Sequence, residues 1–193
     1  MILPFFVLLT IVSVPLAGGR LSRLADLRVR AVGAVLVAIA LQVVIIEVVQ
    51  RAIPHVLASS LHLFSYALAV WFVVANRRIR GLWIVALGGA LNLVAITLNH
   101  GVMPASPAAA RAAGIVKSVG QFENSAPTPG ARIWFLGDVF AVPQRFPMAN
   151  VFSVGDVVLV IGLGVVLHAA CDSRLARRRR ATVGVASAHQ SPN

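Results

Sequence analysis

Long uninterrupted apolar runs are the feature that most limits what this chain can fold into. Five of them lie at residues 2–17, 31–49, 56–75, 81–99 and 154–170. A membrane-crossing helix needs about 20 mostly apolar residues to pass through roughly 30 Å of hydrocarbon, and several runs approach that length. The chain is 59% hydrophobic and 12% charged, which is unusual for a water-soluble domain. The sequence therefore predicts an all-α fold, a polytopic membrane helix bundle of about five transmembrane helices.

Arginines between and after these runs indicate an orientation, because Lys and Arg collect on the cytoplasmic side of a membrane. They form three clusters, after the first run, after the third run and in the tail (Arg20, Arg23, Arg28, Arg30; Arg77, Arg78, Arg80; Arg174, Arg177, Arg178, Arg179, Arg180). The clusters alternate with lightly charged loops. We therefore expect a multi-pass protein of the bacterial plasma membrane with its N-terminus outside and its C-terminus cytoplasmic. Residues 1–172 would form a single transmembrane domain, and 173–193 a basic, disordered cytoplasmic tail.

The net charge of +11 suggests nucleic acid in a soluble protein, but topology explains the arginine clusters better. We expect no nucleic-acid partner. Arg177, Arg178, Arg179 and Arg180 are expected to contact anionic lipid headgroups, where each cation gains about 1 kcal/mol. No phosphate-binding, dinucleotide-binding or metalloprotease motif is present, and the single Cys171 cannot form a zinc site of the Cys-pair type. The sequence thus predicts neither a cofactor nor a metal.

Residues 103–150 are too long for a plain connection and are expected to form an extracytoplasmic loop cap between helices four and five. Ser106 and Pro107 have the residue types of a helix N-cap and first helical position, so a short surface helix should start there. The segment Ala131 to Pro143 is apolar and aromatic but too short to span. It is expected to lie in the membrane interface with Trp134 at headgroup depth.

Few polar side chains interrupt the runs, and three of them are expected at one depth. Counted at about 1.5 Å per residue from the outer helix ends, Gln42, His62 and Asn92 fall roughly 10 to 12 Å below the outer surface. Polar side chains in hydrocarbon need partners, so these residues are candidates for an outward-facing polar site above an apolar floor. The alternatives are structural: hydrogen bonds between helices for Gln42 and Asn92, and packing for His62.

Further candidates lie at the outer helix ends. Ser153 and Asp156 precede the last run with the spacing of a capping box, which by itself accounts for both residues. Asp138 has no such capping role. Asn99 and His100 stand before Gly101, which suits a helix stop, but a stop does not require either of them. The sharpest hypothesis is that Asn99 hydrogen-bonds Asp138 or Asp156 across the outer face.

Taken in order, Asn92, "NHGVMP", "FLGDVFAVP" and "FSVGDVVLVIG" resemble a family of small bacterial multi-pass membrane proteins classed as a domain of unknown function, number 5317. The resemblance covers most of residues 1–170. It implies that ten residues match the family's pattern: Asn92, Asn99, Gly101, Met103, Pro104, Gly137, Asp138, Ser153, Gly155 and Asp156. His100 falls where variation is expected. The family brings no established activity.

We therefore expect an integral plasma-membrane protein that is a non-enzymatic binding or accessory protein. It would contact the lipid bilayer, and a protein partner or homodimer is an open alternative. Its outward-facing polar site would draw on eight residues: Asn92, Asn99, His100, Asp138, Ser153, Asp156, Gln42 and His62. A small transporter or ion-coupled carrier is the alternative function. An enzyme acting on a lipid-linked substrate, with an Asp as general acid or base, is a third.

Overall fold

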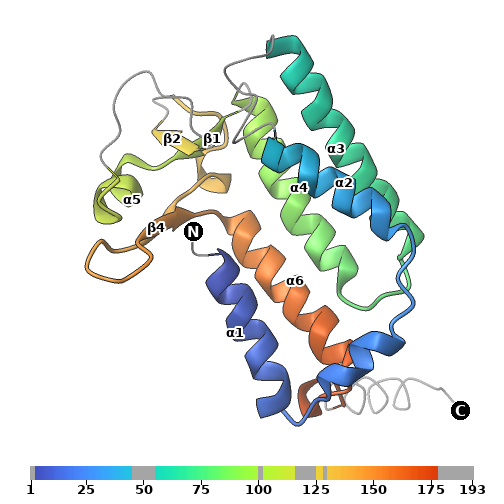
Figure 1. The fold of residues 1–193 in the computed structure, drawn as a ribbon. Helices are drawn as coiled ribbons and strands as arrows, with labels where there is room; N and C mark the ends of the chain where they lie inside the picture. Colours follow the sequence, from blue (N-terminus) through green and yellow to red (C-terminus); the bar gives the residue numbers. More distant parts are fainter. Residues whose placement is uncertain (1–2, 45–54, 100–101, 116–124, 128–129, 178–193) are drawn as a thin grey trace, which may run out of the picture.

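The computed structural model describes residues 3–44, 55–99, 102–115, 125–127 and 130–177 (Figure 1). The long helices are α1 (Leu3–Leu16), α2 (Val32–Val43), α3 (His55–Ala75), α4 (Leu82–Leu98) and α6 (Val154–Ala170). Shorter helical turns are η1 (Leu21–Asp26), α5 (Pro107–Ala112) and η3 (Trp134–Leu136). The strands are β1 (Met103–Ala105), β2 (Ser125–Pro127), β3 (Phe140–Val142) and β4 (Asn150–Phe152).

The expected bundle of five transmembrane helices is wrong in the part of the chain that the structure describes. No helix there is both long enough and apolar enough to cross a membrane. Helices α4 and α6 have 17 residues each, and α1 has 14. At about 1.5 Å per residue, 17 residues reach about 25 Å, which is less than the roughly 30 Å of a hydrocarbon core. Helices α1, α3, α4 and α6, the longest of which is α3 with 21 residues, begin and end within one residue of the expected bounds. The helix bounds were therefore predicted closely, and the interpretation of these helices as membrane spans is what the structure contradicts.

The expectation of an all-α fold is also wrong, because the described part of residues 103–152 contains two small sheets. Strand β1 pairs in parallel with β2, and β3 pairs antiparallel with β4 with Phe140 opposite Phe152. Helix α5 lies beside β3 and β4. These elements and η3 form what we call the cap, which lies at the end of the structure where α4 ends and α6 begins (Figure 1).

Helix α6 is the centre of the helical part, with α4 on one side and α1 on the other (Figure 1). Glycines set the close approach of α4 and α6. A Cβ on Gly88 would lie 2.6 Å from the backbone nitrogen of Leu159, and one on Gly162 would lie 2.5 Å from that of Val85. Small residues let two helix backbones meet. Helix α2 packs instead on α3.

At the end opposite the cap, three arginine-bearing segments meet, and we call this region the arginine end: residues 17–31, 76–81 and 171–177 (Figure 1). The backbone N–H of Arg20 donates to the carbonyl of Cys171 (3.0 Å), and that of Arg174 donates to the carbonyl of Ala17 (3.0 Å). The Arg30 N–H donates to Asn76 Oδ1 (2.8 Å). Segments far apart in sequence are therefore joined into one surface.

Candidate functional site

Three of the sequence candidates form one cluster, which we call the polar clasp: Asn92 on α4 and Ser153 and Asp156 at the start of α6. Asn92 Nδ2 donates to Asp156 Oδ1 (2.9 Å), and Ser153 Oγ donates to Asn92 Oδ1 (2.8 Å). Within α6, the Asp156 N–H donates to Ser153 Oγ and the Ser153 N–H donates to Asp156 Oδ2, both at 3.0 Å. The predicted capping box is confirmed.

The clasp is closed on itself, since each of its polar atoms named above bonds to another member. A carboxylate at a helix N-terminus is favoured by the helix dipole and by the free N–H groups there. Asn92 links the capping box of α6 to α4, and Ser153 is fully buried. Such an arrangement fixes one helix against another. To act on a ligand, it would first have to release one of these bonds.

Asn99 has different partners from those hypothesised. Its side-chain amide pairs with the backbone of Arg132, accepting from the N–H at Oδ1 (2.9 Å) and donating from Nδ2 to the carbonyl (2.9 Å). Nδ2 also donates to the carbonyl of Ala95 (2.8 Å). Asn99 therefore ties the end of α4 to the cap, and Asn92 rather than Asn99 is the asparagine that holds Asp156.

Asn76, which sequence reasoning missed, repeats this arrangement at the end of α3. Its Oδ1 accepts from the Arg30 N–H, and its Nδ2 donates to the carbonyls of Arg30 and Phe72, all at 2.8 Å. Both asparagines directly follow an apolar helix and are buried, at 4% exposed for Asn76 and 7% for Asn99. An asparagine immediately after an apolar helical run was therefore the available signal.

The structure does not bring Gln42 to Asn92. Gln42 Nε2 donates to Ser65 Oγ (2.7 Å), which joins α2 to α3, whereas Asn92 belongs to the α4–α6 contact. His62 lies on α3, with its side chain outside the described atoms, and His100 lies outside the described residues. The expected single polar layer is thus two separate helix contacts as far as the structure describes it.

Asp138 is buried in the cap, at 6% exposed. Its backbone N–H donates to the carbonyl of Pro104 (2.9 Å), and its carbonyl accepts from the Ser106 N–H (3.0 Å). A Cβ at the preceding Gly137 would collide with that same Pro104 carbonyl. The Leu-Gly-Asp stretch therefore adds a backbone ladder beside β1, a role that requires the glycine.

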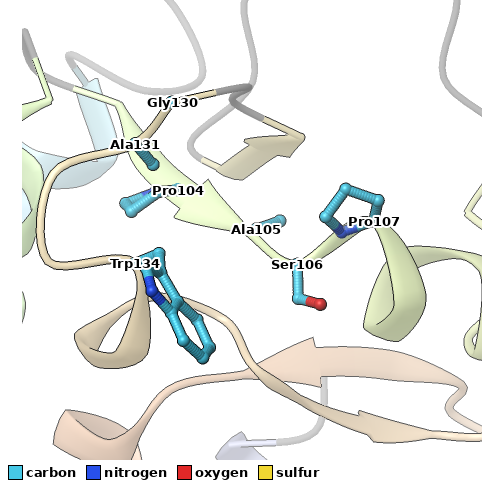
Figure 2. A pocket seen from close by; sticks show the side chains of 7 residues that line it. All are labelled: Pro104, Ala105, Ser106, Pro107, Gly130, Ala131 and Trp134. Carbon is cyan, nitrogen blue, oxygen red and sulfur yellow. The ribbon is translucent and has the colours of Figure 1, made fainter.

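The cap also contains a pocket of about 290 Å³ that no sequence pattern indicated. Figure 2 shows its lining, which comes from the β1–α5 corner, the loop before η3 and the first residue of η3: Pro104, Ala105, Ser106, Pro107, Gly130, Ala131 and Trp134. Trp134 is 64% exposed, so its indole forms an open wall. Ser106 is engaged at the N-cap of α5, as predicted. The pocket is apolar with an aromatic wall, and such a surface suits an apolar group.

A second polar chain joins α1 to α6 near the arginine end. Ser13 Oγ donates to the carbonyl of Thr10 (2.7 Å) and lies 3.1 Å from Nε2 of His168. Nδ1 of His168 lies 2.8 Å from Oγ of the fully buried Ser173. Because the Ser13 proton is already directed to Thr10, the Ser13 oxygen accepts from Nε2–H. This bonding predicts that the neutral form of the His168 ring carries its proton on Nε2.

Asp172 is the acidic partner at the arginine end. Its Oδ2 lies 2.9 Å from Arg23 Nη1 and 3.2 Å from Arg177 Nη2. Burial alone raises the pKa of this carboxyl. The positive charges and hydrogen bonds of Arg177 and Arg23 lower it by more, so the pKa lies below its usual value. Among the described residues, no group of three or more metal-ligating side chains comes together.

The fold and these contacts define a class: a mostly helical protein with a small mixed cap, whose polar side chains join its elements. A family model described as Family of unknown function (DUF5317) matches residues 26–168. The chain belongs to this family. No match is found among the curated proteins or among the solved structures.

Proposed function

We propose that the protein is a non-enzymatic binding or accessory protein that works in contact with the plasma membrane. Its cap would take up an apolar segment of a partner. The observation that carries this proposal is the location of large apolar side chains on the outside of the described structure. All three tryptophans of the chain are among them, with Trp71 at 59%, Trp83 at 57% and Trp134 at 64% exposed.

An apolar exterior needs a covering, because soluble proteins rarely expose large contiguous apolar patches. Helices α1 and α2 carry exposed leucines and valines along their length. Examples are Leu8, Leu36 and Val37, which are 56%, 60% and 49% exposed. Tryptophan is enriched at membrane interfaces, where one part of the ring is apolar and the rest is wet. Contact with lipid would cover these exposed apolar side chains.

The cap pocket supports the binding half of the proposal. Pro104 and Trp134 give it apolar walls, and its polar neighbours are held by the cap's own hydrogen bonds. The transporter alternative would use Asp138 and Asp156 with the Gln42, His62 and Asn92 layer, and Asp156 and Asn92 bond to each other within the clasp. The enzyme alternative needs an Asp with a second catalytic group, either His100 or the other Asp. For a binding role, the clasp needs only to hold α4 and α6 together.

Fractionation of cells making the full chain tests the membrane half. We expect the protein to sediment with membranes and to resist a high-salt wash, because apolar contact is insensitive to ionic screening. Recovery of the folded chain in the soluble fraction would refute membrane contact.

Photo-crosslinking in native membranes tests the pocket. A photoreactive residue at Ala131, which lines the pocket, should give a discrete crosslinked species. Trp134→Ala should abolish it and Phe135→Ala should not, because Phe135 is a neighbouring exposed aromatic residue outside the lining. Equal crosslinking in both variants would count against the pocket as the binding element.

A further inference from the structure

We propose that the arginine end is a binding surface for anionic phospholipid headgroups. The inference deepens the proposed function, since it rests on the proposed contact with a membrane. It concerns which lipids gather at one end of the molecule.

Charge is concentrated there. The three segments contain two aspartates, Asp26 and Asp172, and nine exposed arginines. The arginines are Arg20, Arg23, Arg28, Arg30, Arg77, Arg78, Arg80, Arg174 and Arg177. Asp172 binds Arg23 and Arg177. Among the described residues, no carboxylate forms a salt bridge with Arg77, Arg78 or Arg80. These guanidinium groups offer planar, multiple donors that suit phosphate oxygens.

The surface is held in shape by hydrogen bonds rather than assembled from loose segments. The Asn76 amide fixes the backbone of Arg30 beside the α3–α4 turn. Bonds between Arg20 and Cys171 and between Arg174 and Ala17 fix the first segment to the end of α6. Gly81 brings the start of α4 against α6, since a Cβ there would lie 2.8 Å from the Val166 nitrogen. The three segments that carry the exposed arginines are therefore joined to one another by these bonds.

Apolar side chains stand among these arginines, and they decide between a membrane and other anionic partners. Leu16 at the end of α1 is 81% exposed, and Leu175, next to Arg174, is 56% exposed. Trp83 follows Arg80 by three positions and is 57% exposed. Nucleic acid or a free phosphate would leave these side chains in water. At a lipid surface, the guanidinium groups would bind the phosphates, and the leucines and the indole would lie just below the phosphates.

Quenching of Trp83 fluorescence by brominated lipids tests this inference on the full chain. Trp71→Phe with Trp134→Phe leaves Trp83 as the single tryptophan, and the protein is placed in mixed phosphatidylcholine and phosphatidylglycerol vesicles, with one lipid brominated at a time. We expect phosphatidylglycerol to associate around Trp83 about fivefold more strongly than phosphatidylcholine at low salt. The preference should shrink towards one at about 1 M salt.

Two arginine triples with the same loss of charge make the matched comparison. Arg77→Gln, Arg78→Gln and Arg80→Gln together should remove the preference, and lysine at these positions should keep much of it. Glutamine at the exposed cap arginines Arg111, Arg132 and Arg145 should leave it unchanged.

Each result has one meaning. Quenching by neither brominated lipid would refute the proposed membrane contact itself. Equal quenching by both lipids would overturn the headgroup site while leaving membrane contact standing. If that equality came with salt-sensitive binding of a DNA duplex that the first glutamine triple loses, the surface would be a nucleic-acid site instead.

Discussion

Gly88 and Gly89 are neighbours on α4, and the same substitution should have opposite effects on them. A Cβ on Gly88 would lie 2.6 Å from the Leu159 nitrogen and 2.7 Å from the Gly155 oxygen, both backbone atoms of α6. A Cβ on Gly89 would meet nothing within 4 Å. Replacement of glycine by alanine inside a helix otherwise stabilises it by about 1 kcal/mol.

The magnitude for Gly88→Ala follows from the distance that α4 and α6 must separate. Ordinary contact begins at 3.4 Å, so the 2.6 Å approach requires a shift of about 0.8 Å. The bonds of the nearby clasp, at 2.8 and 2.9 Å, would stretch beyond 3.5 Å if they shared this shift. Losing one neutral and one charged hydrogen bond costs about 4 kcal/mol, and the helix propensity of alanine returns about 1. The net loss is about 3 kcal/mol.

Thermal unfolding of the full chain in mild detergent, followed by circular dichroism, measures both variants. For a chain of this size we expect Gly88→Ala to lower the midpoint by about 10 °C and Gly89→Ala to raise it by about 3 °C. Similar midpoints for the two variants would show that the close α4–α6 contact is not what stabilises the fold.

Three further predictions concern other contacts. Asn99→Ala should cost about 2 to 3 kcal/mol in chemical unfolding because it leaves the backbone of Arg132 unpaired, and Asn99→Asp should not rescue it, since a carboxylate cannot donate to a carbonyl; a cost below about 0.5 kcal/mol would refute this role. The Asp172 carboxyl has a lowered pKa in the folded state, so its stabilisation is present above the unfolded pKa and is lost as pH falls through the folded pKa. Asp172→Asn should flatten the unfolding midpoint between about pH 6 and pH 3, and an unchanged profile would contradict the ion pairs. Nitrogen NMR of the neutral His168 ring should show the proton on Nε2, and a proton on Nδ1 would overturn the inferred Ser13–His168–Ser173 bonding.

Local chemistry was predictable from the sequence where it depends on residues a few positions apart. The capping box of Ser153 and Asp156 and the start of α5 at Ser106 and Pro107 are both present as predicted. Neighbours one helical turn apart meet whatever the rest of the chain does. Such features need no knowledge of the fold.

Partners distant in the chain were not predictable in the same way. Asn92 and Asp156 were both identified as candidates. For Asn99 the hypothesised partner was Asp138 or Asp156, whereas the observed partner is the backbone of Arg132, 33 positions away. A backbone carbonyl and N–H exist at every residue, so no side-chain pattern marks Arg132 as the partner. The short strands of the cap were not predictable from the sequence either, because three residues are too few to show an alternating pattern.

The bounds of α1, α3, α4 and α6 were predicted to within one residue, and only their interpretation as membrane spans was wrong. Hydropathy records which side chains are apolar, and on α1 and α2 these side chains do point outward, as Leu8 and Leu36 show. Helix α1 ends at Leu16, and Gly18 then adopts a left-handed conformation with φ of 70°. Glycine permits that turn regardless of how apolar its neighbours are.

The division between interior and surface bears on where function is located. Asn76, Asn92 and Asn99 each link two elements through bonds that occupy both ends of the side-chain amide. Changing any of them should alter stability before it alters a binding property, because a buried unpaired group is costly. The side chains of Trp134, Arg77, Arg78 and Arg80 are exposed, and none of them makes a hydrogen bond to another element within the part of the chain that the structure describes. Substitutions that change binding while leaving the fold intact are therefore expected at Trp134 and at Arg77, Arg78 and Arg80.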